Sequence, residues 1–157
     1  MIRSILCFGI SAVLIGQAEA APRGGEVPTL ATVKGTCDRL VIGGRDVTAQ
    51  CNGTLLNTSY STGRVGFYFV TSDGAALTFT GMGSSQIKPD PDTAVQPVDG
   101  VIFGFKGQFD RTKAVGTCRF TNPYARPGLV SCKADTQGGN FAAEFTTDGQ
   151  PPSVMKP

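Results

Sequence analysis

The stretch "GTCDRLVIGGRDVTAQC" at residues 35–51 is followed later in the chain by "GTCRFTNPYARPGLVSC" at residues 116–132. Both begin with Gly-Thr-Cys, end on a second cysteine at the same spacing, and carry an arginine at the same position between the cysteines. The first stretch is centred on Gly43-Gly44, a strong turn signal, and the second on Asn122–Pro127, where two prolines forbid a strand. A disulfide across two paired strands needs its turn at that midpoint. We therefore predict two hairpins, each closed by a disulfide.

The pairing of the cysteines is not fixed by sequence alone, because four cysteines allow three schemes. The repeated spacing favours Cys37–Cys51 with Cys118–Cys132, and each such bridge would stabilise the fold by about 3 kcal/mol in the chain-entropy model. The long-range schemes would close larger loops and require the two stretches to be neighbours in space. A zinc site is disfavoured because the chain has no C-x-x-C spacing and no histidine. The repeat itself fits either a decayed internal duplication or two hairpins that converged on the same bridge.

The N-terminal segment, residues 1–20, has the three parts of a cleaved signal peptide: Arg3, an apolar run, and the small-x-small pattern Ala18-Glu19-Ala20. The apolar run is too short to span a bilayer and holds the fifth cysteine, Cys7. We expect a mature chain that is exported to the periplasm or the extracellular space, with no membrane insertion. Disulfides are the usual state of paired cysteines in that compartment.

The mature chain predicts an all-β fold, because short β-branched and aromatic runs alternate with Gly, Asn, Asp and Ser clusters. We expect a single antiparallel β-sandwich or barrel of about 8–10 short strands with two disulfide-stapled hairpins. The expected strands are 29–33, 36–42, 47–51, 54–58, 64–71, 75–81, 101–109, 114–120, 128–133 and 140–146.

Alternating aromatic residues indicate one dry face. Phe67 and Phe69 are two residues apart, and Phe103, Phe105 and Phe109 are separated by two and four residues. Because side chains alternate between the faces of a strand, each set is expected on one face of its strand. We interpret this stripe as ordinary core. The alternative is the lining of a ligand cavity, which would make the protein a small-ligand carrier barrel.

Residues 29–146 are expected to form the single domain, with flexible tails at residues 21–28 and 147–157, the latter disordered. Within it, residues 84–100 are expected to form a Pro- and Asp-rich loop, since Pro89, Pro91 and Pro97 each lack a backbone donor.

The chemistry of the chain argues against an enzyme. Without histidine, Ser-His and Cys-His nucleophiles are impossible, and no cofactor or metal site is expected. A calcium site at Asp90, Asp92 and Asp99 is disfavoured, because the required third ligand and glycine are replaced by Ala94 and Val95.

Two carboxylates at the right separation could still hydrolyse a glycosidic bond. Asp99, Asp110 and Glu144 are the acids near expected strands. A carboxylate-dyad carbohydrate-active enzyme is therefore kept as an alternative.

The binding hypothesis rests on Arg45 and Arg126, which occupy equivalent positions at the two expected hairpin tips. If both tips faced one side, they could hold an anionic group. Basic residues are scattered singly, which argues against nucleic acid. We expect a non-enzymatic binding or structural module of the cell envelope or extracellular space, whose partner is an envelope protein or an anionic glycan.

Overall fold

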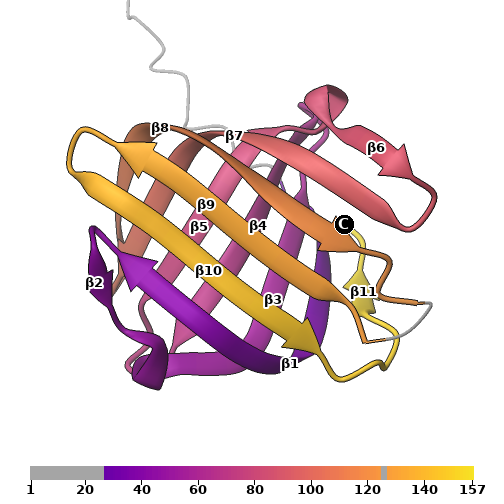
Figure 1. Cartoon of the computed structure of the whole chain (residues 1–157), viewed down its shortest axis with the longest axis horizontal. Helices are drawn as coiled ribbons and strands as arrows, with labels where there is room; N and C mark the ends of the chain where they lie inside the picture. Colours follow the sequence, from indigo (N-terminus) through magenta and orange to yellow (C-terminus); the bar gives the residue numbers. More distant parts are fainter. Residues whose placement is uncertain (1–26, 125–126) are drawn as a thin grey trace, which may run out of the picture.

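The computed structural model describes residues 27–124 and 127–157, and within them the chain forms one antiparallel sheet closed into a barrel (Figure 1). Each wall strand pairs with the next one along the chain, and β10 pairs with β1 to close the barrel. The all-β prediction is confirmed, and of its two forms the structure has the barrel. The eight wall strands are β1 (Thr29–Ile42), β3 (Cys51–Ser59), β4 (Arg64–Thr71), β5 (Ala76–Met82), β7 (Thr93–Phe105), β8 (Gln108–Thr121), β9 (Leu129–Thr136) and β10 (Gly139–Thr147).

Three short strands add to this wall. β2 (Arg45–Asp46) folds back on β1, β6 (Ile87–Asp90) pairs with β7, and β11 (Ser153–Met155) pairs with β1. The only helical elements in the described ranges are two 3-10 turns, η1 (Thr48–Gln50) and η2 (Gly83–Ser85). No helix in these ranges is long and apolar enough to cross a membrane.

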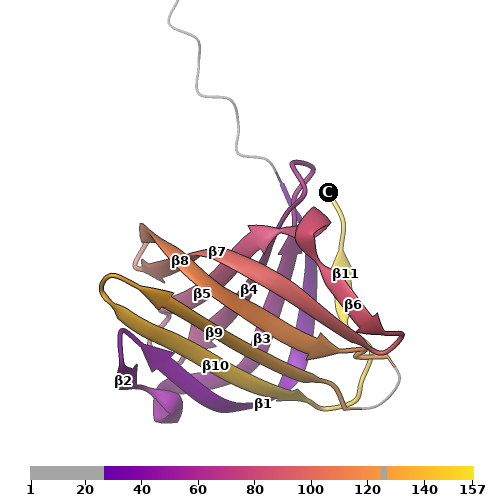
Figure 2. The same ribbon diagram turned by 45° about the horizontal axis from the view of Figure 1, so that its top comes forward.

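The barrel has two different ends, on the left and the right of Figures 1 and 2. The "turn end" carries the short connections after β1, β4, β7 and β9, and includes β2. The "loop end" carries β6, β11 and the longer connection between β8 and β9. This division follows from the antiparallel order of the strands, and it decides which surface residues are neighbours.

The barrel interior is packed with aromatic and aliphatic side chains. The rings of Phe69 and Phe79 meet edge to face at 5.9 Å, and those of Phe67 and Phe120 at 5.1 Å. Leu40, Leu55, Leu77 and Phe145 are also fully buried. The core interpretation of Phe67 and Phe69, both on β4, is confirmed.

The other part of the predicted stripe is wrong: Phe103 and Phe105 on β7 are 37% and 36% exposed, and Phe109 is on a different strand. Residues 101–109 are not one strand, because a two-residue turn at Lys106-Gly107 separates β7 from β8. Both turn residues have positive φ, 49° and 78°, as such hairpin turns require. Phe109 therefore does not share the face of Phe103 and Phe105, and it lies outside the barrel across Gly104.

Both disulfides of the favoured local scheme are present. Cys118 and Cys132 are directly opposed on β8 and β9, with their Cα atoms 4.0 Å apart, and both are fully buried in the core. Cys37 and Cys51 are also bonded, with a Cα–Cα distance of 5.9 Å, and pack against the same core.

The second stretch, residues 116–132, runs along β8 and β9 as the predicted hairpin, but the first stretch, residues 35–51, is built differently. Its Gly43-Gly44 turn is present, with φ values of 58° and 81°. The predicted strand 47–51 is wrong: η1 occupies most of it, and direct pairing of β1 with β3 ends at Lys34 and Thr54. Beyond that point β1 pairs with β10, so Cys37 lies opposite Phe145. The Cys37–Cys51 bridge thus ties together two strands that are separating.

The repeated Gly-Thr-Cys has a structural reason. A Cβ at Gly35 would lie 2.0 Å from the carbonyl oxygen of Thr146, and a Cβ at Gly116 would lie 2.0 Å from that of Lys133. Only glycine allows the neighbouring strand so close. Each cysteine lies two positions on, on the same face of its strand, and therefore points into the barrel.

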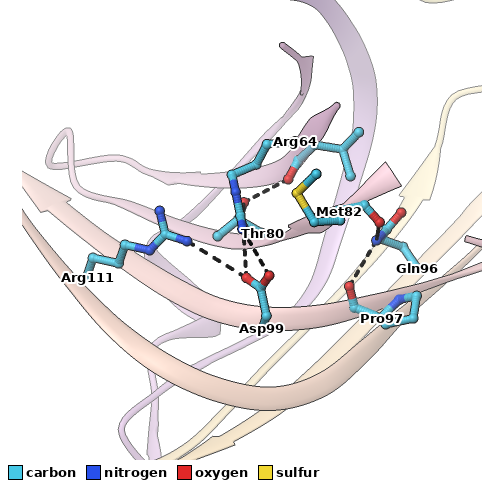
Figure 3. A network of polar contacts seen from close by, with 8 residues as sticks. Arg64, Thr80, Met82, Gln96, Pro97, Asp99 and Arg111 are labelled. Carbon is cyan, nitrogen blue, oxygen red and sulfur yellow. Dashed lines mark hydrogen bonds and ion pairs between the residues drawn. The ribbon is translucent and has the colours of Figure 1, made fainter. Parts of the chain in front are cut away.

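The expectations for residues 84–100 and 147–157 need correction, because they contain η2, β6, the first part of β7, and β11. Pro97 even lies in a central strand, between β5 and β8. β5 pairs with β7 only from Gly100 to Gly104, so the imide nitrogen of Pro97 lies where the ladder to β5 has already ended. There the buried side-chain amide of Gln96 donates from Nε2 to the carbonyl oxygens of Met82, at 2.8 Å, and Pro97, at 2.9 Å (Figure 3).

Replacing Gly81 by alanine should destabilise the barrel, because the new Cβ would lie 2.1 Å from the carbonyl oxygen of Pro97. We expect a loss of about 1–3 kcal/mol in the free energy of unfolding, measured by urea titration. Gly138→Ala is the matched control, since its nearest neighbour would be 3.7 Å away, and it should leave the midpoint nearly unchanged. Equal stability of the two variants would contradict the close approach of Gly81 to the backbone of Pro97.

Removing the buried bridge with the double variant Cys118→Ala/Cys132→Ala should lower the free energy of unfolding by about 3 kcal/mol, the loop-closure contribution alone. The measurement is thermal or urea unfolding under non-reducing conditions. Peptide mapping of unreduced wild-type protein provides the independent check, and a peptide linking Cys37 to Cys118 or Cys132 would contradict the pairing.

Candidate binding surface

The two arginines predicted from the repeat are not brought together by the described residues. Arg45 is exposed on β2 at the turn end. Arg126 lies outside the described residues, and its described neighbours Tyr124 and Pro127 belong to the connection at the loop end. The hypothesis that both tips hold one anionic group therefore stays a prediction, because Arg126 lies outside the described residues.

The three carboxylates of the alternative enzyme hypothesis are also separate. Asp99 on β7 forms an ion pair with Arg64, and Glu144 on β10 faces Arg39 at 3.9 Å. Asp110 is on β8, where it lies opposite Phe103 of β7. No hydrogen bond joins any two of these acids. Within the described ranges, no group of three or more His, Cys, Asp or Glu side chains is placed to hold a metal ion.

The most connected polar group on the outer wall is centred on Asp99 (Figure 3). The guanidinium of Arg64 crosses β5 and donates to both carboxylate oxygens of Asp99, at 2.8 and 3.0 Å, and to the hydroxyl of Thr80 at 3.3 Å. Arg111 approaches the same carboxylate from β8, at 3.8 Å. These hydrogen bonds from Arg64 lower the pKa of Asp99, against the opposing effect of partial burial, and the same bonds raise the pKa of Arg64. Such a two-point contact fixes the position of Arg64.

Beside this network, β8 has an open edge. β9 pairs with β8 only from Val115 to Phe120, so residues 108–114 have a partner strand only on the β7 side. A two-residue turn makes its flanking residues, Phe105 and Gln108, a hydrogen-bonded pair. The alternation of an antiparallel ladder then directs the backbone N–H and C=O groups of Phe109, Arg111 and Lys113 to the open side.

The side chains on this part of β8 form a mixed apolar and cationic surface. Phe109, Arg111, Lys113 and Val115 alternate along the strand and point outward; we call these four residues the β8 face. Phe109 is 76% exposed and Val115 81% exposed, and the two cations Arg111 and Lys113 lie between them on the same face of the strand.

The surface next to the β8 face is hollowed. A shallow groove of about 810 Å³ begins where β9 ends and runs along β8 to the Asp99 network. It is lined by Arg64, Asp99, Arg111, Lys113, Ala114, Val115, Asp135, Thr136 and Gln137. Three of these side chains are cationic and two are anionic, and the two arginines already share Asp99. Lys113 makes no ion pair with a described residue.

The barrel interior offers much less room. A pocket of about 210 Å³ lies at the loop end, lined mostly by apolar side chains that include Val33, Leu55, Phe67, Phe120 and Tyr124. Ligand pockets usually measure about 300–1,000 Å³, and the rest of the interior is filled by the core. The interior pocket therefore leaves little space for the ligand of a carrier barrel.

Sequence reasoning missed the β8 face because it missed a turn. Lys106-Gly107 is a weak turn signal, and treating residues 101–109 as one strand placed Phe109 in the core. The available signal was Arg111 and Lys113: continuing the alternation from Phe109 shows that it shares a face with two cations.

The acid dependence of stability should contain a contribution from Asp99. Its pKa in the folded state lies below the ordinary value of 3.8, so its stabilising effect is present above about pH 4 and is lost as the pH falls through the lower, folded-state pKa. Asp99→Asn should therefore lower the melting temperature at neutral pH and lose this difference in acid. The effect is expected to be below about 1 kcal/mol, since the carboxylate is half exposed.

Asp92→Asn is the control, because that exposed carboxylate makes no ion pair or side-chain hydrogen bond with a described residue. A pH-independent difference between Asp99→Asn and the wild type would contradict the assignment.

Three comparisons with known proteins bear on function: with protein-family models, with curated protein sequences and with solved structures. None of them finds a match for this chain. Among the described residues, the β8 face combines exposed side chains with an open backbone edge, which makes it the candidate binding surface.

Proposed function

We propose that this protein is a non-enzymatic exported binding module that engages a protein partner through the β8 face. The observation that carries the proposal is the coincidence, on one strand, of exposed apolar side chains, cations and an unpaired backbone edge. The adjoining groove adds surface that a partner could fill.

Export is supported by two independent features. The pattern of residues 1–20 is that of a signal peptide, and these residues lie outside the described part of the chain. The two disulfides point to an oxidising compartment outside the cytoplasm.

A protein partner is favoured over the other ligands considered. Two of the candidate acids, Asp99 and Glu144, already face arginine side chains, and the interior pocket is small for a carried ligand. For an anionic glycan, Arg64 is held by both oxygens of Asp99, which leaves Arg111 and Lys113 as the available cations of this surface. Phe109 and Val115 offer apolar contact area, which protein interfaces use.

The test is site-specific photo-crosslinking in the native compartment. A photoreactive phenylalanine analogue at position 109 should give a discrete crosslinked product, because this largely exposed side chain belongs to the β8 face. The same analogue at Asn52, an exposed residue on β3 four strands away around the barrel, is the matched control. Identical patterns at the two positions, or no product at either, would refute the proposed surface.

A further inference from the structure

We propose that the partner binds by adding a β-strand to the open edge of β8, as an extended segment that carries acidic side chains. This inference rests on the proposed function and specifies how the β8 face is used. It concerns residues 108–114, which are paired with β7 on one side and have no strand on the other within residues 27–124 and 127–157.

The open edge is ready to pair. The N–H and C=O groups of Phe109, Arg111 and Lys113 face away from β7, and no backbone hydrogen bond outside the ladders involves residues 108–114. An added strand would supply partners for these groups, and main-chain hydrogen bonds provide the affinity in this mode of recognition. Proteins usually shield such edges, so an edge left open beside exposed apolar residues needs an explanation.

The space for the added strand is also present. β9 pairs with β8 as far as Asp135 opposite Val115 and turns away after Thr136. The groove begins at that point, against Lys113, Ala114 and Val115 on one side and Thr136 and Gln137 on the other. An incoming strand would lie beside residues 108–114 of β8, in the position that β9 would occupy if it continued.

The charges select the partner. In a strand paired with residues 108–114, alternate side chains would lie next to Phe109, Arg111 and Lys113 on the outer face. Opposite charges in such cross-strand pairs are stabilising, so acidic residues at alternate positions fit this edge. Lys113 is the most available cation, since it makes no ion pair with a described residue, whereas Arg111 is 3.8 Å from Asp99.

A second copy of the chain is a poor occupant of the same edge. If two β8 edges paired antiparallel about Arg111, the two Arg111 side chains would be directly opposed and each Phe109 would meet Lys113. Like charges directly opposite one another destabilise a sheet. The cations therefore discourage self-pairing while they favour an acidic segment.

The experiment uses the full mature protein and three capped synthetic peptides: TEVEVET, its lysine counterpart TKVKVKT, and TEVEVET N-methylated at alternate residues. Binding is followed by NMR titration of the backbone amides. The acidic peptide should shift the amides of Phe109, Arg111 and Lys113 and slow their hydrogen exchange, while the lysine and N-methylated peptides should bind at least about tenfold more weakly.

Charge-reversed protein gives the reciprocal test. Arg111→Glu/Lys113→Glu should weaken binding of the acidic peptide by about tenfold or more and strengthen binding of the lysine peptide. Lys88→Glu/Lys156→Glu, which makes the same charge change on exposed residues at the loop end, should change neither affinity. Circular dichroism of both variants verifies that the barrel is intact.

Each adverse result has a distinct meaning. Equal binding of the N-methylated peptide would overturn strand addition, although crosslinking at position 109 would still support the proposed surface. Equal binding of the acidic and lysine peptides would overturn the charge selection. If no peptide binds and Arg111→Ala/Lys113→Ala merely self-associates, the cations serve only to block self-pairing, and the inference fails.

Discussion

Closing eight strands into a narrow barrel is the constraint on which the rest of this structure depends. The strands must bend sharply, and at the bends the backbone of one strand comes too close to the next for any side chain. Gly35, Gly81 and Gly116 occupy these places, each facing a carbonyl oxygen of the adjacent strand. Because the glycines also set which residues face inward, the positions of the bridged cysteines follow from the same bends.

The same constraint explains how the wall accommodates an interruption. β7 continues beyond the last residue that pairs with β5, which leaves a gap between the two strands. In this gap backbone carbonyl oxygens would lack hydrogen-bond donors. The side-chain amide of Gln96 takes the place of a missing strand there, and Pro97 is tolerated because its missing N–H falls in the gap. At the other end of the wall, residues 108–114 of β8 extend beyond the end of β9, and nothing in the described chain fills the space beside them. At the first gap Gln96 supplies donors from within the fold, although its own Oε1 is buried without a described partner, whereas the second gap is open to solvent and is therefore functionally interesting.

Much of the fold could be predicted from short-range patterns, and the failures have physical causes. The repeated cysteine spacing gave the correct bridges, and the parity of Phe67, Phe69, Leu77 and Phe79 gave the correct core face. Barrel closure between β1 and β10 could not be predicted, because it depends on contacts between the two ends of the chain. The prolines of residues 84–100 argued against a strand, but a proline is harmful only where its nitrogen faces a partner. The candidate surface was missed for the related reason that an open edge is defined by where a neighbouring strand stops.

The complete burial of Cys118 and Cys132 links two properties that are usually independent. A disulfide is reduced when a thiolate attacks one of its sulfur atoms, and that attack requires access. Here access requires the wall of the barrel to part, so the rate of reduction is governed by the frequency of that opening. The bridge and the core thus protect each other: the packed interior keeps reductants away from the sulfur atoms, and the intact sulfur–sulfur bond limits how often the interior is exposed.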